Sequence, residues 1–220
     1  MKQFLSVVLL AFSLCSLANI PEHETDFFSG PYLSLGPSML IHSSKIKSRA
    51  TSDGFVFFKA SDTGNSFGLN AEFGMRRVIK RFLADGDISL RYFPGTSSGM
   101  QISGINTPRV YAPINLGFEL KPGVLLTSRT ALFAIIGVET AHFKVGYIFN
   151  SVNTQLKGWQ VGPSIGAGVN IAILTRLLLQ MRYLYIYYND LNYNDSSNAA
   201  RVTFKPRMNI VELNLSYRFK

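Results

Sequence analysis

Hydrophobic and polar side chains alternate one by one over long stretches of this chain. The longest stretch is residues 158–173, where Trp159, Val161 and Ile165 share one apolar face, while glycine, serine, glutamine and asparagine dominate the other. Successive side chains of a β-strand point to opposite faces, so this period of two predicts a long strand and argues against an amphipathic helix.

Seven further segments carry the same period and are expected to be strands: residues 31–41, 66–76, 82–93, 110–126, 131–145, 177–188 and 208–219. Three tight links, at residues 77–81, 127–130 and 175–176, alternate with longer polar stretches at residues 42–63, 94–108, 146–157 and 189–202. Short turns at one end and long loops at the other are typical of membrane barrels. The pattern therefore predicts an all-β, antiparallel transmembrane β-barrel of about eight strands in an up-and-down meander.

Two of these segments, residues 110–126 and 131–145, fit this pattern less simply. Ala112 is expected on the outer face, and Pro122-Gly123 forms either a turn or a bulge. Phe133 and Ile135 place apolar side chains on an inner face that is otherwise polar.

The N-terminus has the features of a cleaved secretory signal peptide over residues 1–18. Lys2 supplies the positive start, residues 4–14 the apolar centre, and Ser16-Leu17-Ala18 the small-x-small cleavage site. The alternative is an uncleaved membrane anchor. Cys15 lies inside the leader, so the expected barrel domain, residues 19–220, has no cysteine. Beyond the leader no apolar run reaches the roughly 20 residues of a transmembrane helix.

The polar face of the predicted strands carries charged residues, which would then lie inside the barrel. These are Glu72, Asp85, Asp87, Arg91, Glu119, Glu139, Arg182, Glu212 and Arg218. A buried charge without a partner is costly, so we expect a structural network of ion pairs centred on Arg91 and Arg182. The cations Arg76, Arg77, Lys80 and Arg81 near the first tight link are interpreted as leaflet or topology charges.

Aromatic residues are expected at the two membrane interfaces, where rings with a polar edge are favoured. Tyr92, Trp159, Tyr185 and Tyr187 would lie at the outer interface, and Phe82, Tyr217 and Phe219 at the periplasmic one.

Three segments carry a resemblance to a known family. They are Gly30-Pro31-Tyr32-Leu33-Ser34-Leu35-Gly36, Gly162-Pro163-Ser164-Ile165-Gly166-Ala167-Gly168 and Leu213-Asn214-Leu215-Ser216-Tyr217-Arg218-Phe219. They resemble the outer-membrane β-barrel family of OmpA-like and opacity-type surface proteins. The resemblance implies an integral outer-membrane location and recognition of the C-terminal strand by the insertion machinery. Phe219 is penultimate here, since Lys220 follows it.

The chain is basic, with a formal net charge of +9 that includes Lys2 of the leader. This charge suits phosphate-bearing partners such as lipopolysaccharide, or an anionic host surface, contacted by cations in the long loops. Export and the lack of a nucleic-acid motif argue against nucleic acid.

Candidate catalytic residues are few, because the chain has only three histidines. His42 and Ser44 have the spacing seen in lipid A deacylases, but at the first strand and not late in the chain. Glu139 and His142 are three apart, which puts them on opposite faces of a strand. No metal spacing appears, and no cofactor is expected.

We therefore expect a non-enzymatic surface barrel that contributes to envelope integrity and contacts surface or host ligands through its loops. The alternatives are a narrow channel for small solutes and, less favoured, a lipid A-modifying enzyme. At the level of the fold, the rival is a soluble lipocalin-like barrel with its apolar residues facing inward.

Overall fold

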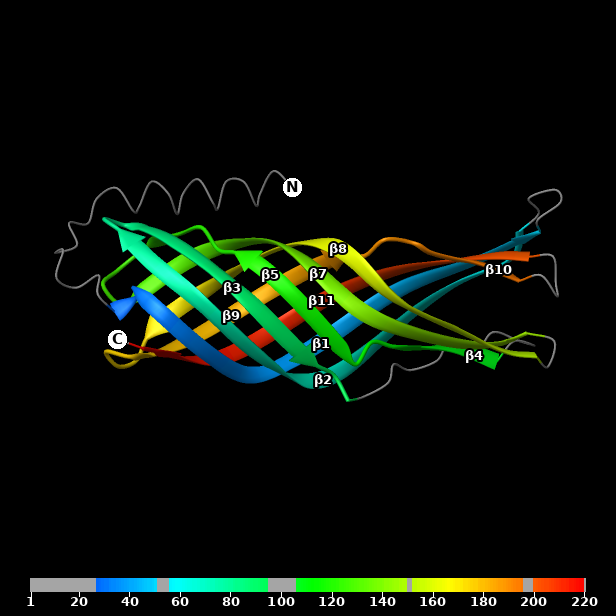
Figure 1. The fold of residues 1–220 in the computed structure, drawn as a ribbon, viewed down its shortest axis with the longest axis horizontal. Helices are drawn as coiled ribbons and strands as arrows, with labels where there is room; N and C mark the ends of the chain where they lie inside the picture. The colour runs from blue at the N-terminus through cyan, green and yellow to red at the C-terminus, as the bar shows by residue number, and fades with distance from the viewer. Residues whose placement is uncertain (1–26, 51–55, 95–105, 150–151, 196–199, 220) are drawn as a thin grey trace.

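The fold is a single antiparallel β-barrel, shown in Figure 1. The computed structural model describes residues 27–50, 56–94, 106–149, 152–195 and 200–219. The expected leader, residues 1–18, lies outside them. Within the described ranges no helix is long and apolar enough to cross a membrane.

Eleven β segments make up the sheet. They are β1 (Gly30–Ala50), β2 (Val56–Ile79), β3 (Phe82–Tyr92), β4 (Asn106–Tyr111), β5 (Ile114–Leu120), β6 (Gly123–Leu125), β7 (Thr130–Phe149), β8 (Val152–Ala172), β9 (Leu177–Tyr187), β10 (Leu191–Asp195) and β11 (Ala200–Arg218). The pieces β4, β5 and β6 follow one another along β7, and β9 and β10 follow one another along β11. The segments therefore form eight strands in up-and-down order, which confirms the expected fold.

The sheet closes because its first and last strands pair. β1 and β11 run antiparallel from Tyr32 opposite Arg218 to Ala50 opposite Ala200. No edge of the sheet is left open along this seam, so the strands satisfy one another's backbone groups.

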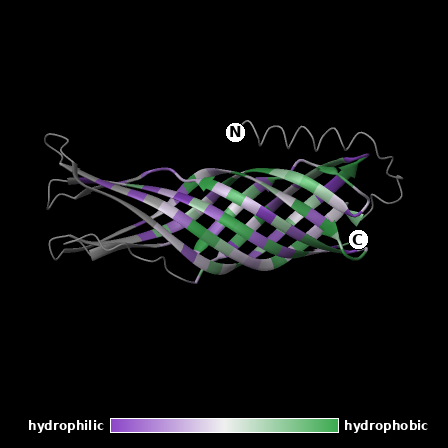
Figure 2. Ribbon diagram, turned by 180° about the vertical axis from the view of Figure 1, so that it is seen from behind, coloured by the Kyte–Doolittle hydropathy of each residue, from purple (hydrophilic) through white to green (hydrophobic). Residues whose placement is uncertain are grey.

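Side chains alternate between a polar interior and an apolar exterior. On β3, Asp85, Asp87 and Arg91 are buried, while Ile88 and Leu90 are exposed. The apolar exterior forms a continuous band around the barrel (Figure 2), where Phe67 is 71% and Ile165 63% exposed. Such a band is far larger than the surface of a water-soluble protein tolerates, which contradicts the lipocalin-like alternative.

The broken strand β4–β5–β6 explains two positions that the sequence pattern left unusual. Tyr111 pairs with Lys144, whereas Asn115 pairs with Ala141, so the register slips by one residue at Ala112-Pro113. This bulge turns Ala112 inward, and its expected position on the outer face is wrong. Pro122 interrupts the ladder without a turn, because β6 resumes in the register of β5.

The strands extend well past the apolar band at one end. Most of residues 42–63, 146–157 and 189–202 belong to paired strands in place of the expected loops, forming long hairpins that project from the barrel (Figure 1). Backbone pairing needs only a neighbouring strand, so a hairpin can continue where its side chains no longer alternate. Residues 95–105 of the remaining expected loop lie outside the described ranges. At the other end β2 and β3 meet in a tight turn at Lys80-Arg81, where Lys80 adopts a φ of 59°.

Candidate functional site

Ten charged side chains, all buried, come together inside the barrel. Arg91 of β3 lies at the centre and contacts three carboxylates from three other strands. Its Nε donates to Glu212 at 2.8 Å, its Nη1 to Glu139 at 2.7 Å and its Nη2 to Glu119 at 2.5 Å. One guanidinium thus links β3, β5, β7 and β11 across the lumen.

Arg182 of β9 forms a second hub on the same carboxylates. Its Nη1 donates to Glu119 at 2.6 Å, its Nη2 lies 2.7 Å from Glu72, and its Nε donates to Glu212. Glu119 and Glu212 are therefore shared between the two arginines, so each carboxylate bridges two cations.

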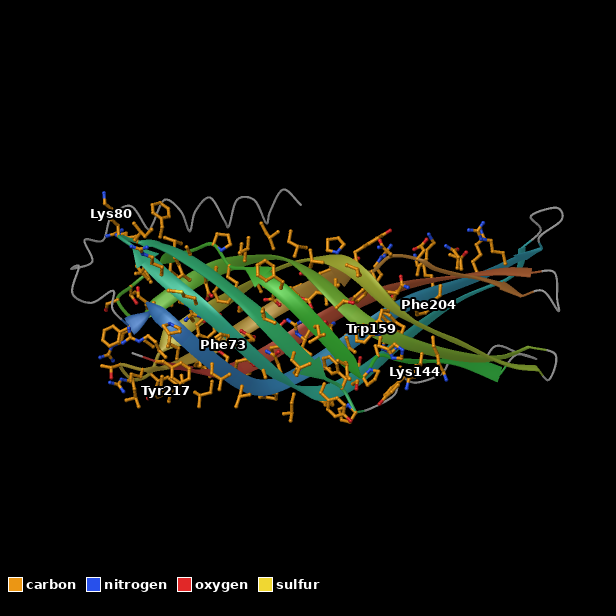
Figure 3. All side chains as sticks on the ribbon, in the orientation of Figure 1. Phe73, Lys80, Lys144, Trp159, Phe204 and Tyr217 are labelled. Carbon is orange, nitrogen blue, oxygen red and sulfur yellow. The ribbon has the colours of Figure 1, made fainter. Side chains whose placement is uncertain are left out.

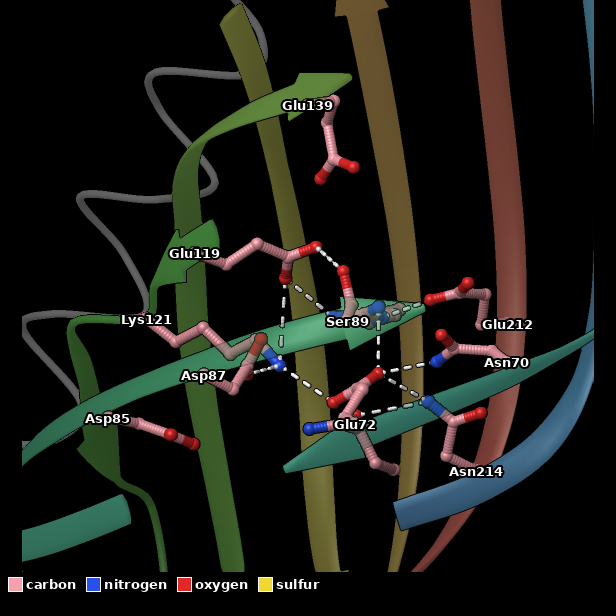
Figure 4. Close-up of polar contacts among 12 residues, drawn as sticks. Asn70, Glu72, Asp85, Asp87, Ser89, Glu119, Lys121, Glu139, Glu212 and Asn214 are labelled. Carbon is pink, nitrogen blue, oxygen red and sulfur yellow. Dashed lines mark hydrogen bonds and ion pairs between the residues drawn. The ribbon is translucent and has the colours of Figure 1, made fainter. Parts of the chain in front are cut away.

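Lys121 is a third cation, and Figure 4 shows carboxylates from three strands around its ammonium group. Its Nζ lies 2.9 Å from Glu72 and 3.6 Å from Glu119, and it also pairs with Asp87. Lys121 continues the inward positions of β5, just before the break at Pro122.

A smaller group lies nearer the short turns. Arg76 donates from Nε to Asp85 at 2.7 Å and stacks over the Tyr32 ring at 4.5 Å. The Tyr32 hydroxyl lies 2.9 Å from carboxylate oxygens of both Asp85 and Asp87. Tyr32 thereby connects this group to the Lys121 group. Arg76 is buried, so its interpretation as a leaflet charge is wrong.

The buried charges do not balance, because four cations face six carboxylates. Neutral donors contact the excess acceptors. The Nδ2 atoms of Asn70 and Asn214 donate to Glu72 at 2.6 and 2.7 Å, and Ser38 donates to Glu212 at 3.2 Å. Glycine also makes room, since a Cβ on Gly117 would lie 2.5 Å from both oxygens of Glu139. Hydrogen bonds and ion pairs thus connect most of the charged side chains in this part of the lumen.

Apolar side chains fill the lumen on both sides of this charged layer. On the inward face of β9, Leu178 lies before Arg182, and Leu184 and Ile186 lie after it. These three apolar side chains are buried. Toward the hairpins, the ring of Phe143 packs against Tyr188 and Phe204 at centroid distances of 5.0 and 5.9 Å. Toward the short turns lie other buried apolar residues: Phe28, Leu83, Leu125, Ala131 and Phe133.

Of the two candidate catalytic pairs, Glu139 and His142 do not come together, and the side chain of Ser44, the partner of His42 in the other pair, lies outside the described part of the structure. Glu139 faces the lumen and pairs with Arg91, whereas His142 packs against Trp159 at a centroid distance of 5.3 Å. His42 is buried opposite Gly64 and Met208. In the described part of the chain no group of three or more His, Cys, Asp or Glu is placed to hold a metal ion.

The expected interface aromatics lie on the outer face at the two ends of the apolar band. Tyr92, Trp159 and Tyr187 are exposed toward the hairpins, and Tyr185 is half-buried. Tyr217 and Phe219 are exposed at the short-turn end, with their rings 5.4 Å apart. Figure 3 shows Trp159 and Tyr217 toward opposite ends of the band.

The sequence pattern predicted most of the charged residues inside the barrel, but not two residues that connect them, Lys121 and Tyr32. The structure brings Glu72, Asp87, Arg91, Glu139, Arg182 and Glu212 into one group, and places Asp85 beside Arg76. Arg218 instead donates to the carbonyl oxygens of Ser29 and Thr175 at the short-turn end. Lys121 and Tyr32 were missed, although both occupy inward positions of the alternating pattern.

Comparisons with known proteins agree with this architecture. A family model described as the OmpA-like transmembrane domain matches residues 111–220, which is half of the chain. The solved structure of OprG from Pseudomonas aeruginosa is 11% identical, covers 87% of this chain and 98% of its own, and has a TM-score of 0.56. Its similarity shows the shared barrel fold.

Two further solved structures are similar at TM-scores below 0.5. Neisserial surface protein A is 13% identical, with 87% of this chain and 98% of that chain covered and a TM-score of 0.46. The outer-membrane protease OmpT from Escherichia coli is 9% identical, with 86% and 97% covered and a TM-score of 0.49. No curated protein sequence matches the chain.

Proposed function

Because the chain belongs to the OmpA-like transmembrane domain family and is an integral outer-membrane β-barrel, we propose that it is a non-enzymatic surface protein with a closed lumen. It strengthens the outer membrane as a rigid barrel and contacts ligands at the surface through its projecting hairpins. The short turns face the periplasm and the hairpins face the exterior, as is usual for such barrels.

The filled lumen is the observation that carries this proposal. A charged layer that joins six strands through Arg91, Arg182 and Lys121 lies between two apolar layers. A path for solutes would have to break these buried ion pairs, and apolar constrictions also oppose the passage of water and ions. An eight-stranded barrel has an interior that side chains can fill completely.

The hairpins support a role at the surface. Five strands run beyond the apolar band: β1, β2, β7, β8 and β11. Their outer parts are regular β-structure that is not required to span the membrane. We further propose that Tyr92, Trp159, Tyr185 and Tyr187 meet the outer headgroups, and Tyr217 and Phe219 the inner ones. In this proposal the insertion machinery reads β11 as the C-terminal strand.

Conductance in planar lipid bilayers tests the closed lumen. The protein is purified from outer membranes, and its gel mobility with and without boiling verifies that the barrel is folded. We expect no single-channel currents above those of protein-free bilayers. Discrete currents from the folded protein would replace this proposal with the narrow-channel alternative.

A matched variant tests whether the apolar layer on the hairpin side is needed to keep the lumen closed. Replacing Phe143 and Tyr188 with alanine removes two rings of the outer apolar layer and leaves every charged partner in place. A folded F143A/Y188A barrel is expected to stay closed if the charged layer alone seals it. Lipid A mass spectrometry of cells with and without the protein tests the enzymatic alternative, and we expect identical masses.

A further inference from the structure

Cations face one another directly across neighbouring strands where the hairpins leave the apolar band. Lys45 of β1 is the register partner of Lys205 of β11, and Arg49 is the partner of Arg201. On the other side of β1, Lys47 is the register partner of Lys59 of β2. Side chains that are directly opposite have Cβ atoms only about 5 Å apart, so like charges there repel one another.

The same arrangement occurs in the hairpin formed by β7 and β8. Lys144 is the register partner of Lys157, and both side chains are exposed. The Lys144 ammonium also lies 5.8 Å from the centroid of the Tyr111 ring on β4. Two separate hairpin systems thus carry paired cations at the same end of the barrel (Figure 1).

These cations continue the outer face of the barrel. Lys45 and Lys205 follow the odd-numbered positions whose side chains are exposed on β1 and β11. They lie just above the aromatic end of the apolar band: Arg207 stacks on Tyr187 at 3.4 Å, and Lys157 is two residues from Trp159, about 7 Å along a strand. Figure 3 shows Lys144 beside Trp159.

Among the hairpin lysines whose side chains the structure describes, only Lys205 has a carboxylate partner, unlike the paired cations of the lumen. Lys205 pairs with Asp190 at 2.5 Å. Among the side chains that the structure describes, Lys45, Lys47, Lys144 and Lys157 have no carboxylate within ion-pair distance. Lys144 and Lys157 therefore oppose like charges, and Asp190 offsets only one of the two charges of the Lys45–Lys205 pair, so an external anion would supply the missing charge.

We propose that the two hairpin systems bind the phosphate groups of outer-leaflet lipopolysaccharide, with Lys45, Lys47 and Lys205 in one site and Lys144 and Lys157 in the other. A lipid is the occupant because the cations lie on the lipid-facing side of the strands, directly above the band that contacts the acyl chains. Ammonium groups bind phosphate as point charges and need no fixed fork geometry. This inference relies on the proposed function only for the outward orientation of the hairpins.

Titration of the folded full-length protein with lipid A tests the proposal. Binding from zwitterionic detergent micelles is followed by native mass spectrometry, with diphosphorylated lipid A as the probe and dephosphorylated lipid A as its comparison. Two double variants, K45Q/K47Q and K144Q/K157Q, each remove two cations from one site. R77Q/K80Q removes two exposed cations from the short-turn end and is the matched control.

We expect each site variant to bind diphosphorylated lipid A about thirtyfold more weakly, from roughly fivefold per cation, with the control unchanged. Dephosphorylated lipid A should bind weakly to all forms. Equal affinity of the site variants and the control would overturn the proposal, as would equal affinity for the two lipids. Competition by heparin as strong as that by lipid A would assign the cations to a soluble polyanion and would also overturn it.

Thermal unfolding gives a second readout that a merely solvated set of lysines would not show. Without anionic lipid, K144Q/K157Q should unfold at a higher temperature than the parent protein, because the repulsion between the two ammonium groups is gone. With diphosphorylated lipid A the order should reverse. The same order of unfolding temperatures with and without lipid A would contradict the proposal. The conductance of the lumen, which tests the proposed function, does not depend on the lipid-binding or unfolding results.

Discussion

The barrel body and the projecting hairpins share one continuous sheet but are stabilised in different ways. In the body, Arg91 and Arg182 are fully paired inside while Phe73 and Ile165 face outward to lipid. In the hairpins the backbone pairing is the same, but residues of like charge, such as Lys45 and Lys205, lie opposite each other on neighbouring strands. Backbone pairing is therefore common to both regions, and side chains decide what each region can do.

The comparison also shows where the chain tolerates change. The body has two demanding environments, a buried lumen and a lipid exterior, and each strand residue faces one of them. The hairpins face water on at least one side, so their side chains are not required to pack in the lumen or against lipid and can bind a ligand. Substitutions should accordingly cost most in the lumen, less on the lipid face and least in the hairpins.

The largest effect is expected for Arg91→Ala. The change leaves Glu119, Glu139 and Glu212 without the cation that joins them, and breaking a buried pair costs about 3–5 kcal/mol. Urea unfolding in lipid vesicles, followed by gel mobility without boiling, measures the loss. Arg77→Ala, at an exposed position, is the control. An unfolding midpoint equal to that of the parent would show that the charged layer contributes little stability.

A somewhat smaller loss is expected for Phe73→Arg in the middle of the apolar band. Arginine facing lipid near the bilayer midplane costs about 2–4 kcal/mol. The same residue introduced in the hairpin, as Asn192→Arg, should have almost no effect, since Asn192 is exposed beside Thr203. Equal losses from the two substitutions, measured by the same unfolding assay, would remove the distinction between the regions.

Gly117→Ala tests the packing around the charged layer. A Cβ at this position would collide with the carboxylate of Glu139 and the hydroxyl of Ser89, and overpacking of this kind costs about 1–3 kcal/mol. At Gly86 the nearest atom to a new Cβ is Leu120 Cδ2 at 3.5 Å, so Gly86→Ala should be tolerated. Thermal unfolding of the two variants separates the cases, and a destabilised Gly86→Ala would argue against the assigned packing.

The smallest effect is expected from shortening a hairpin. Deleting residues 192–203 and joining Leu191 to Phe204 through Asn-Gly keeps their register pair in a favourable two-residue turn. Because the deleted strand residues extend β10 and β11 beyond the apolar band, stability should change by less than about 1 kcal/mol. The boiling-dependent gel shift should persist. Its loss would mean that the hairpin supports the barrel itself.

The strands of the body were predictable because both environments act on every residue of a strand. At residues 158–173 lipid selects Trp159 and Ile165 while the interior selects Gly166 and Gly168, and this leaves a regular period in the sequence. The hairpins have no such contrast between faces, so residues 42–63 were expected to be a loop although most of them are paired.

The charged layer was predictable in composition but not in its pairing. The alternating pattern places Glu72 and Arg182 inside, yet their contact depends on the tilt and stagger of nonadjacent strands. Lys121 escaped notice because it borders the break at Pro122, where the pattern ends. Arg76 was interpreted as a leaflet or topology charge because it is close to a turn, where charged side chains are usually exposed to solvent.

The seam between β1 and β11 has a consequence for how the protein is made. β1, the first strand of the barrel, pairs with β11, its last strand, so this seam cannot form until β11 has been synthesised. Until then a partial sheet would have two edge strands with unpaired backbone N–H and C=O groups. Such a sheet could not enter a bilayer, where these groups find no hydrogen-bond partners. The closed barrel can therefore form only after all of its strands are available. A chain that lacked β11 would leave β1 without its partner at the seam and could not close this barrel.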